Sequence, residues 1–190
     1  MKIAVYSGSF NPLHIGHKAI MEYLTKEKYF DKIYMIVSPQ NPLKPQGNET
    51  TGKERYLSAL KTIKKYPQLQ ESVIVDDIEL TMPSPQYTIK TLDALKAREP
   101  QNDFTLIIGA DNLSSIHKWR DYKRILSEYG VAVYPRKGFD INKIKQELLS
   151  EHQENGTYKI RLFKAPEIDA SSTMIRESLE NKKDITNLLM

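Results

Sequence analysis

The sequence predicts an α/β protein with a Rossmann-like, doubly wound parallel sheet, and three observations support this. Short apolar, β-branched runs alternate along the chain with segments that have helical spacing. The runs are continuously apolar, which is typical of strands that are buried on both faces. Neither an internal repeat nor a composition break divides the 190 residues. We therefore expect residues 1–190 to form a single domain with a sizeable core.

The expected elements follow from these runs. After the first strand, a helix is indicated by apolar recurrence from Ile20 to Leu24. Five more helices are expected at 52–66, 88–98, 119–129, 141–152 and 172–181, and the strands are expected at 3–6, 33–37, 73–75, 104–108, 131–134 and 158–163.

Composition and charge exclude some classes of protein. Hydrophobic residues make up 39% and charged residues 27%, as in ordinary globular chains. The net charge of +4 comes from 28 basic and 24 acidic residues that are interleaved, so charge does not select nucleic acid as a partner. The absence of cysteine excludes disulfides and thiolate zinc sites. Neither a signal peptide nor an apolar stretch of the ~20 residues needed to span a membrane is evident, so we expect a cytoplasmic protein.

The stretch from Ser7 to His17 connects the first predicted strand to the first predicted helix. Parallel sheets commonly place ligands at such a crossover. Gly8 allows a tight turn and the close approach of a ligand to the backbone. We expect Asn11 to cap the helix and Pro12 to occupy its first turn. The free amides of this helix start would then bind a phosphate.

His14 and His17 stand three residues apart at this predicted helix start, so they would share one face beside the amides. Two imidazoles in that place indicate neutralisation of charge on a phosphoryl group. The alternative is that His14 is an ordinary surface residue and His17 a capping one. Half of the chain's four histidines fall within these four positions beside a glycine turn, which favours the phosphate site.

A second candidate site follows the predicted strand at 104–108. Gly109 would permit a close approach of backbone and ligand, and Asp111 could accept hydrogen bonds from ribose hydroxyls. The alternative is a turn in which Asp111 caps the next helix. Trp119, the only tryptophan of the chain, lies among cations. It could stack on an aromatic ring, but taken alone this pattern favours packing.

Two further segments carry cations that could meet the same ligand. The connection from Ser38 to Thr51 contains three prolines and is long for a compact domain. Its Lys44 could close over a triphosphate or be a solvated loop lysine. Near the C-terminus, Arg176 falls in the first turn of a predicted helix, where a bound anion would explain a cation. A plain cap with a solvent-facing arginine is the alternative, and the cap would come from Ser171, Ser172 and Thr173.

Several of these residues also carry a family resemblance. Gly-Ser-Phe-Asn-Pro-Leu-His-Ile-Gly-His (8–17) resembles the signature G-x-F-D-P-x-H-x-G-H of the nucleotidyltransferases that share a core with class I aminoacyl-tRNA synthetases. Asn11 stands where that family usually has Asp, so the capping oxygen is kept and a negative charge is lost.

Three further segments are similar to motifs of the bacterial nicotinate-nucleotide adenylyltransferases. They are Ser-Pro-Gln-Tyr-Thr-Ile-Lys-Thr-Leu (84–92), Ile-Ile-Gly-Ala-Asp-Asn-Leu with the following His-Lys-Trp, and Ser-Ser-Thr-Met-Ile-Arg. The likeness extends from the first strand to about Leu188. Asn-Pro-Leu-Lys (41–44) looks like a subgroup variant in which Leu43 replaces a histidine.

The resemblance implies an enzyme of NAD biosynthesis. It would join nicotinate mononucleotide to the AMP part of ATP, giving nicotinate adenine dinucleotide and pyrophosphate. The mononucleotide phosphate would attack the α-phosphorus without a covalent enzyme intermediate, so the protein would supply positioning and charge stabilisation. Mg²⁺ would arrive with ATP, because no dedicated cluster of carboxylates is evident.

The same resemblance implies a role for each candidate residue. His14 and His17 would bind the ATP phosphates and stabilise the transition state. Trp119 would stack on the pyridine ring and Thr88 would meet its carboxylate, while Asp111 would hold the adenosine ribose. The phosphates would also be met by the cations Lys44, Arg55 and Arg176, and by hydroxyls or amides of Ser9, Phe10, Ser171, Ser172 and Thr173.

The sequence leaves three alternative classes of protein to be compared with this one. A pantetheine-phosphate or glycerol-phosphate nucleotidyltransferase would share the first motif but lack the segments of Thr88 and Trp119. An aminoacyl-tRNA synthetase fragment would need a Lys-Met-Ser-Lys-Ser loop, which is missing here. A basic RNA-binding module would use aromatic stacking on a charged face, but the 11 tyrosines are scattered along the chain.

Overall fold

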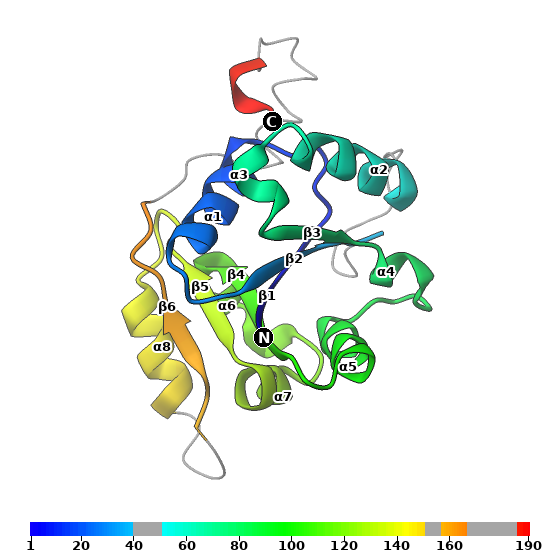
Figure 1. Ribbon diagram of the computed structural model, residues 1–190. Coiled ribbons are helices and arrows are strands. Elements are labelled where there is room, and N and C mark those ends of the chain that lie inside the picture. Colours follow the sequence, from blue (N-terminus) through cyan, green and yellow to red (C-terminus); the bar gives the residue numbers. More distant parts are fainter. Residues whose placement is uncertain (40–50, 151–156, 167–185) are drawn as a thin grey trace.

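The computed structural model describes residues 1–39, 51–150, 157–166 and 186–190 (Figure 1). Six parallel strands form one sheet in the order β3-β2-β1-β4-β5-β6. The predicted doubly wound topology is therefore confirmed. The strands are β1 (Lys2–Gly8), β2 (Lys32–Val37), β3 (Val73–Asp76), β4 (Asp103–Gly109), β5 (Val131–Tyr134) and β6 (Ile160–Leu162).

Helices follow most strands, as the alternation of patterns predicts. The α-helices are α1 (Ile15–Lys26), α2 (Gly52–Ile63), α3 (Pro67–Gln70), α4 (Ile78–Thr81), α5 (Thr88–Arg98), α6 (Ala110–Ser114), α7 (Tyr122–Arg124) and α8 (Ile141–Ser150). Two short 3-10 helices are η1 (Ile116–Lys118) and η3 (Thr186–Leu188), and η2 (Ile125–Tyr129) is a π-helix.

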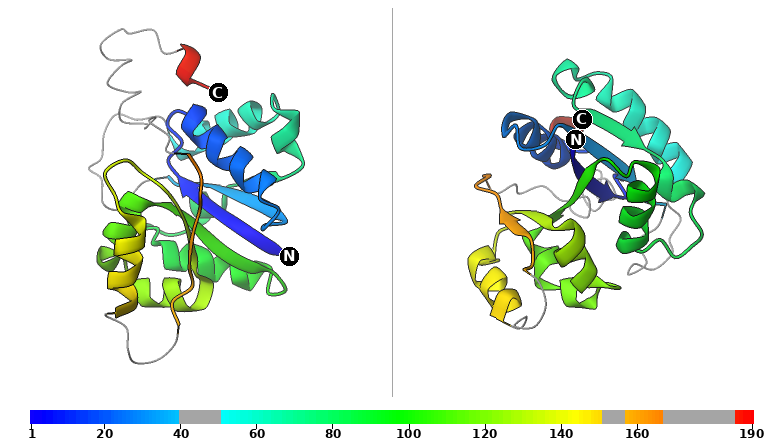
Figure 2. Two further views of the ribbon diagram at one scale, coloured as in Figure 1. Left: turned by 90° about the vertical axis from the view of Figure 1, so that its left-hand side faces the viewer. Right: turned by 60° about the horizontal axis from the view of Figure 1, so that its bottom comes forward.

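The sheet is covered on both faces, and the strand residues alternate between two apolar clusters. Ile3 and Val5 of β1 face the cluster that is formed with α5, α6, η2 and α8. Ala4 and Tyr6 face the other cluster, formed with α1, α2 and α3. Figure 2 shows the sheet between these two layers of helices. Burial on both faces explains why the strand sequences are continuously apolar.

One predicted helix is wrong in its extent. The expected helix at 119–129 begins only at Tyr122 and passes into the π-helix η2 at Ile125. Its start is delayed because Asp121 has a φ of +52°, in the left-handed region that a continuous helix does not visit. The helix expected at 52–66 is confirmed but ends at Ile63, and the helix expected at 141–152 is confirmed over its described residues, 141–150. The helix expected at 172–181 lies outside the described residues.

The strand order places a topological switch point between β1 and β4. The chain moves outward from β1 through β2 to β3, then returns to add β4 on the other side of β1. Connections therefore leave β1 and β4 in opposite directions at their carboxyl ends, which is where open α/β sheets bind ligands. β1 ends at Gly8 and β4 ends at Gly109. The first two candidate motifs thus lie at the same edge of the sheet.

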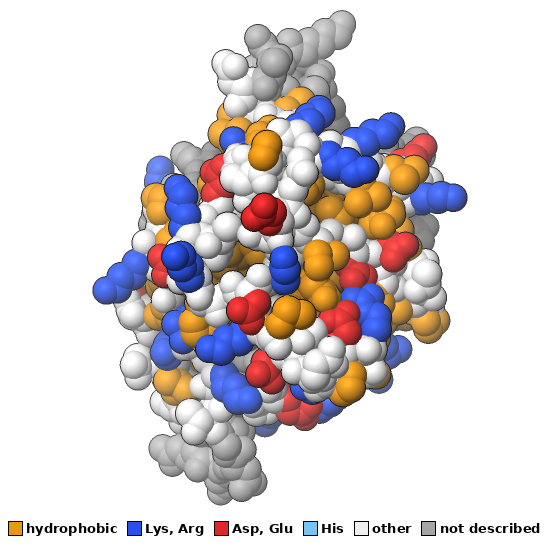
Figure 3. Space-filling model, viewed as in Figure 1, with side chains coloured by type: hydrophobic (Ala, Val, Ile, Leu, Met, Phe, Trp, Pro, Cys, Tyr) orange, Lys and Arg blue, Asp and Glu red, His pale blue; other side chains and the backbone are white. Residues whose placement is uncertain are grey.

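On the face that Figure 3 shows, basic and acidic side chains are interspersed, and neither charge forms a large patch. This agrees with the interleaved charges of the sequence. Within the described residues, no helix has the length and apolar character needed to cross a membrane.

Candidate active site

The two histidines of the first motif lie against each other at the start of α1. Their ring centroids are 3.7 Å apart and their planes meet at 31°. Nδ1 of His14 accepts the amide of Gly16 at 3.1 Å, and Nδ1 of His17 accepts the amide of His14 at 3.2 Å. The pair forms a capping box in which imidazoles take the places of the usual hydroxyl and carboxylate. The prediction that both rings share one face is confirmed.

The start of this helix differs from the expected one. The predicted cap at Asn11 and the placing of Pro12 in the first turn are wrong, because residues 11 and 12 form a turn and α1 begins at Ile15. The ring of His14 supplies the capping atom in place of Asn11. Its Nδ1 also accepts the amide of Gly16, as Nδ1 of His17 accepts the amide of His14. The expectation that these amides are free to bind a phosphate is therefore wrong for His14 and Gly16.

Both imidazoles are neutral at pH 7. Burial lowers the pKa of His14 to about 4, with the positive charge of Arg136 as the second cause. Burial, then the neighbouring His14 and Arg136, also lower the pKa of His17 well below its ordinary value. Since Nδ1 of each neutral ring accepts a hydrogen bond, the ring proton is on Nε2. Each ring therefore carries one N–H donor, at Nε2.

The C-terminal residues lie beside this pair. Leu189 pairs with His14 in an isolated antiparallel bridge, and the amide of Met190 donates to the carbonyl of Leu13 at 3.5 Å. His14 is only 2% exposed, whereas His17 is partly exposed. His17 is thus the more accessible of the two rings.

Gly8 and Phe10 shape the turn between β1 and α1. A Cβ atom on Gly8 would lie 3.3 Å from the ring of Phe10. Phe10 has a φ of +46°, which L-residues rarely adopt, and its ring is 4% exposed. That ring packs edge-on against Tyr6 at 5.4 Å and His17 at 5.0 Å between centroids. The side chain of Phe10 therefore supports His17, and its backbone is the part that could meet a phosphate.

Arg55 connects the two loops that flank this turn. Its guanidinium donates from Nη1 to the carbonyls of Ser9 at 2.6 Å and Ser38 at 2.7 Å. Nη2 donates to the carbonyl of Pro39 at 2.7 Å, and the residue as a whole is 5% exposed. The described bonds of this cation thus hold backbone together after β1 and β2. Its contact with a phosphate stays a prediction.

The carboxyl end of β4 brings Gly109 and Asp111 to the same edge. A Cβ atom on Gly109 would lie 2.3 Å from Oδ1 of Asp111 and 3.2 Å from the ring of Tyr134, so a larger residue would displace the carboxylate of Asp111. Asp111 lies in the first turn of α6 and Gly109 is its N-cap, so the alternative in which Asp111 caps this helix is wrong. The carboxylate of Asp111 is exposed and can accept hydrogen bonds from a ligand.

Arg136 belongs to this site, although no sequence motif pointed to it. Its Nε lies 3.8 Å from Oδ1 of Asp111, and its Nη2 donates to the hydroxyl of Tyr134 at 3.3 Å. Its charge also contributes to the lowered pKa values of both histidines. A signal was available, because Arg136 follows β5 and the carboxyl ends of parallel neighbours meet at one edge.

The segments of Thr88 and Trp119 lie side by side. Thr88 is the first residue of α5, and its N-cap Tyr87 makes no side-chain bond to the helix. The guanidinium of Arg120 lies 4.9 Å from the centroid of the Tyr87 ring, which joins the segment after η1 to the start of α5. Trp119 is partly buried and packs on the core cluster of α5. The structure therefore brings these two predicted residues into one region.

The remaining predicted site residues lie outside the described part of the chain. These are Lys44, Ser171, Ser172, Thr173 and Arg176.

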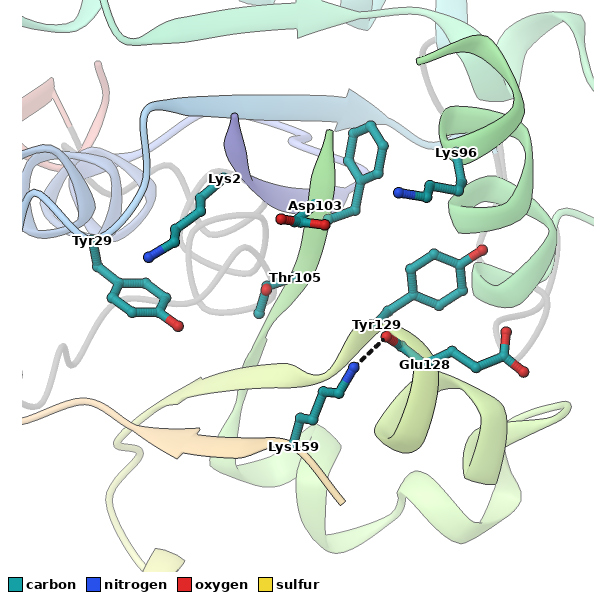
Figure 4. Close-up of a pocket in the computed structure, with 9 residues that line it drawn as sticks. Lys2, Tyr29, Lys96, Asp103, Thr105, Glu128, Tyr129 and Lys159 are labelled. Carbon is teal, nitrogen blue, oxygen red and sulfur yellow. Dashed lines mark hydrogen bonds between the residues drawn. The ribbon is translucent and has the colours of Figure 1, made fainter. Parts of the chain in front are cut away.

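A cavity of about 360 Å³ lies at the opposite edge of the sheet (Figure 4). Its lining includes Lys2 and Asp103, where β1 and β4 begin, and Lys159, directly before β6. The histidines are at the carboxyl edge, where parallel sheets bind ligands, so we place the candidate site there. Among the described residues, no group of three or more histidine or acidic side chains could hold a metal ion.

The parallel sheet and the paired histidines after β1 define a Rossmann-like nucleotidyltransferase. The model of the cytidylyltransferase-like family matches residues 5–178. A Flavobacterium psychrophilum protein named "probable nicotinate-nucleotide adenylyltransferase" is 40% identical over 189 residues, which cover 100% of this chain and 92% of that protein. A Bacteroides thetaiotaomicron protein of the same name is 38% identical, covering 100% and 87%. The chain belongs to the nicotinate-nucleotide adenylyltransferases of the cytidylyltransferase-like family.

Solved structures share the fold. A Plasmodium falciparum nicotinic acid mononucleotide adenylyltransferase complexed with NaAD superposes with a TM-score of 0.80 at 20% identity, covering 98% of this chain and 87% of that one. The same enzyme complexed with APC gives a TM-score of 0.78 at 18% identity, covering 99% and 90%.

Proposed function

We propose that this protein transfers the adenylyl group of ATP to nicotinate mononucleotide, giving nicotinate adenine dinucleotide and pyrophosphate. The observation that carries the proposal is the pair of neutral histidines at the carboxyl edge of β1, each with a donor at Nε2. The proposal is also supported by relatives that match this whole chain, because they are named as probable nicotinate-nucleotide adenylyltransferases.

The reaction is a displacement at phosphorus. A phosphate oxygen of the mononucleotide forms a bond to the α-phosphorus of ATP, and the bond from that phosphorus to the bridging oxygen of pyrophosphate breaks. Negative charge grows on the phosphate oxygens during this step, so fixed donors aimed at them lower the barrier. His17 and His14 would donate from Nε2, and Arg136 would add a positive charge on the same side. Mg²⁺ would arrive with ATP, held by the phosphates themselves.

The acceptor would be recognised at the start of α5. The first amides of a helix and its dipole favour an anion, so the carboxylate of a nicotinate ring would be stabilised beside Thr88. Trp119, next to this helix start, would stack on the pyridine ring. Asp111 would accept hydrogen bonds from the adenosine ribose beside Gly109. We also assign phosphate contacts to Lys44 and Arg176 and to the hydroxyls or amides of Ser9, Phe10, Ser171, Ser172 and Thr173.

We expect Trp119→Ala to raise the KM for nicotinate mononucleotide about tenfold or more, because stacking on the ring is lost. The KM for ATP should change by less than about threefold, since the indole would meet only the acceptor. Trp119→Phe, which keeps an aromatic face, is the matched variant and should lie between the two. Initial rates with each substrate varied in turn provide the measurement. An equal rise of both KM values would remove the stacking assignment.

The activity itself is tested by incubating the full chain with Mg-ATP and one acceptor at a time, and measuring pyrophosphate. The acceptors are nicotinate mononucleotide, nicotinamide mononucleotide and phosphopantetheine. We expect release to be fastest with the nicotinate form, because only its ring carries the anion that the start of α5 favours. Release that does not depend on the acceptor, or that is fastest with phosphopantetheine, would contradict the proposal.

A further inference from the structure

Glu79 has a buried carboxylate that accepts hydrogen bonds from three hydroxyl groups. It lies in α4 and is 4% exposed. Its Oε1 accepts Oγ1 of Thr91 at 2.8 Å and Oγ of Ser7 at 3.4 Å, and its Oε2 accepts Oγ of Ser38. The hydroxyls of Ser7 and Ser38 are themselves 3.1 Å apart. One side chain therefore bonds residues from three separate elements.

These three places border the candidate active site. Ser7 is in β1, directly before Gly8, and Ser38 directly follows β2. The amide of Ser38 also donates to the carbonyl of Gly8 at 2.9 Å, so the two strand ends are joined twice. Thr91 is in α5, one turn after Thr88. Glu79 thus links the phosphate side of the site to the helix that would hold the acceptor.

The chemistry of this group is unusual for a merely structural residue. Burial raises the pKa of Glu79, and the hydrogen bonds from Ser38, Thr91 and Ser7 oppose that rise. Burying a carboxylate costs free energy unless it is fully bonded, and an apolar residue of similar size often stabilises a core as well or better. A bonded carboxylate offers something that an apolar side chain does not, namely a fixed direction to each partner.

We propose that Glu79 is a positioning residue, which fixes α5 against the loops after β1 and β2 so that the acceptor phosphate is held in line with the α-phosphate of ATP. This inference rests on the proposed function. In-line attack needs the reacting atoms about 3–3.5 Å apart, and a displacement of about 1 Å can cost a hundredfold in rate. Loosening the link should therefore lower kcat more than it weakens the binding of either substrate.

The test compares Glu79→Gln with variants of its partner Thr91. Thr91→Val removes the hydroxyl at nearly constant shape, and Thr91→Ser restores it. The matched control is Asp76→Asn, because Asp76 is also buried, at 8% exposure, and also bonds α5. Its carboxylate pairs with Arg98, in the last turn of that helix and away from Thr88. Each variant is measured for kcat, both KM values and Tm.

We expect Glu79→Gln to lower kcat about ten- to a hundredfold, with both KM values within about threefold. Thr91→Val should show the same pattern to a smaller degree, and Thr91→Ser should recover most of kcat. Asp76→Asn should lower Tm and leave kcat within about threefold.

Two results would overturn the proposal. One is wild-type kcat in the folded Glu79→Gln protein, and the other is a loss of kcat in Asp76→Asn as large as that in Glu79→Gln. If Glu79→Gln fails to fold, the two Thr91 variants test the proposal instead. Equal kcat values in Thr91→Val and Thr91→Ser would then overturn the positioning role of Glu79. Wild-type protein that releases no pyrophosphate with nicotinate mononucleotide would refute the proposed function itself, and this inference with it.

Discussion

The His17→Ala protein should have a kcat about a hundredfold or more below that of the wild type. Removing one fixed donor from a site where negative charge develops typically costs 10²–10³ in rate, roughly 2.7–4 kcal/mol. His17 is the partly exposed ring of the pair, and its proton on Nε2 is the donor that the helix cap leaves available. Steady-state pyrophosphate release measures the loss, and circular dichroism checks that the fold is intact.

The same substitution also removes a helix cap, so a matched variant is needed. His17→Glu can still accept the amide of His14 through its side-chain carboxylate, as glutamate does at this place in ordinary capping boxes. It has no N–H donor in place of Nε2. We expect His17→Ala to lose about 1 kcal/mol of stability and His17→Glu to lose less, while both lose turnover. Near-normal turnover in either folded variant would refute the assignment of His17.

The free energy of unfolding of the Arg55→Lys protein should be about 2–4 kcal/mol lower than that of the wild type. A lysine ammonium cannot reproduce the planar fork that reaches the carbonyls of Ser9, Ser38 and Pro39. A buried carbonyl that loses its donor costs about 1–3 kcal/mol, and these three are partly buried, so each costs less than that maximum. For a chain of this length, Tm should fall by roughly 5–15 °C. Thermal and urea unfolding provide the measurements.

A surface arginine serves as the control for this prediction. Arg124 bonds the carboxylates of Asp93 and Glu128, but all three side chains are 42–48% exposed. Arg124→Lys should therefore cost less than about 1 kcal/mol. If Arg55 instead serves mainly to bind phosphate, Arg55→Lys would raise the KM for ATP at unchanged Tm. That outcome would contradict the backbone role derived from its hydrogen bonds.

The positions of the strands and the histidine pair were within reach of the sequence because both depend on local patterns. Apolar runs mark strands wherever both faces are buried, and a separation of three residues puts His14 and His17 on one helix face. The cap at Asn11 was predicted wrongly because a histidine side chain took that position. Local sequence patterns also did not predict the left-handed conformation of Asp121, which delays the helix expected from Trp119 onward.

Other features of the site depend on residues far apart in the chain. Glu79 meets Ser7 across 72 positions, and Arg55 meets Ser9 across 46. Arg136 reaches Asp111 only because β4 and β5 are neighbours in the sheet. No spacing rule connects such pairs before the strand order is known.

The sequence by itself determined the fold class and the two motifs at the ends of β1 and β4, since periodicity and short-range spacing are properties of neighbouring residues. The family followed from the resemblance of its motifs to known ones. Only the tertiary structure decided that the rings of His14 and His17 are neutral, that Arg55 bonds backbone, and that Glu79 joins three elements. Those properties come from burial and from partners that folding brings together. A protonation state or a hydrogen-bond partner is set by the surroundings in space, and the linear order of residues does not contain them directly.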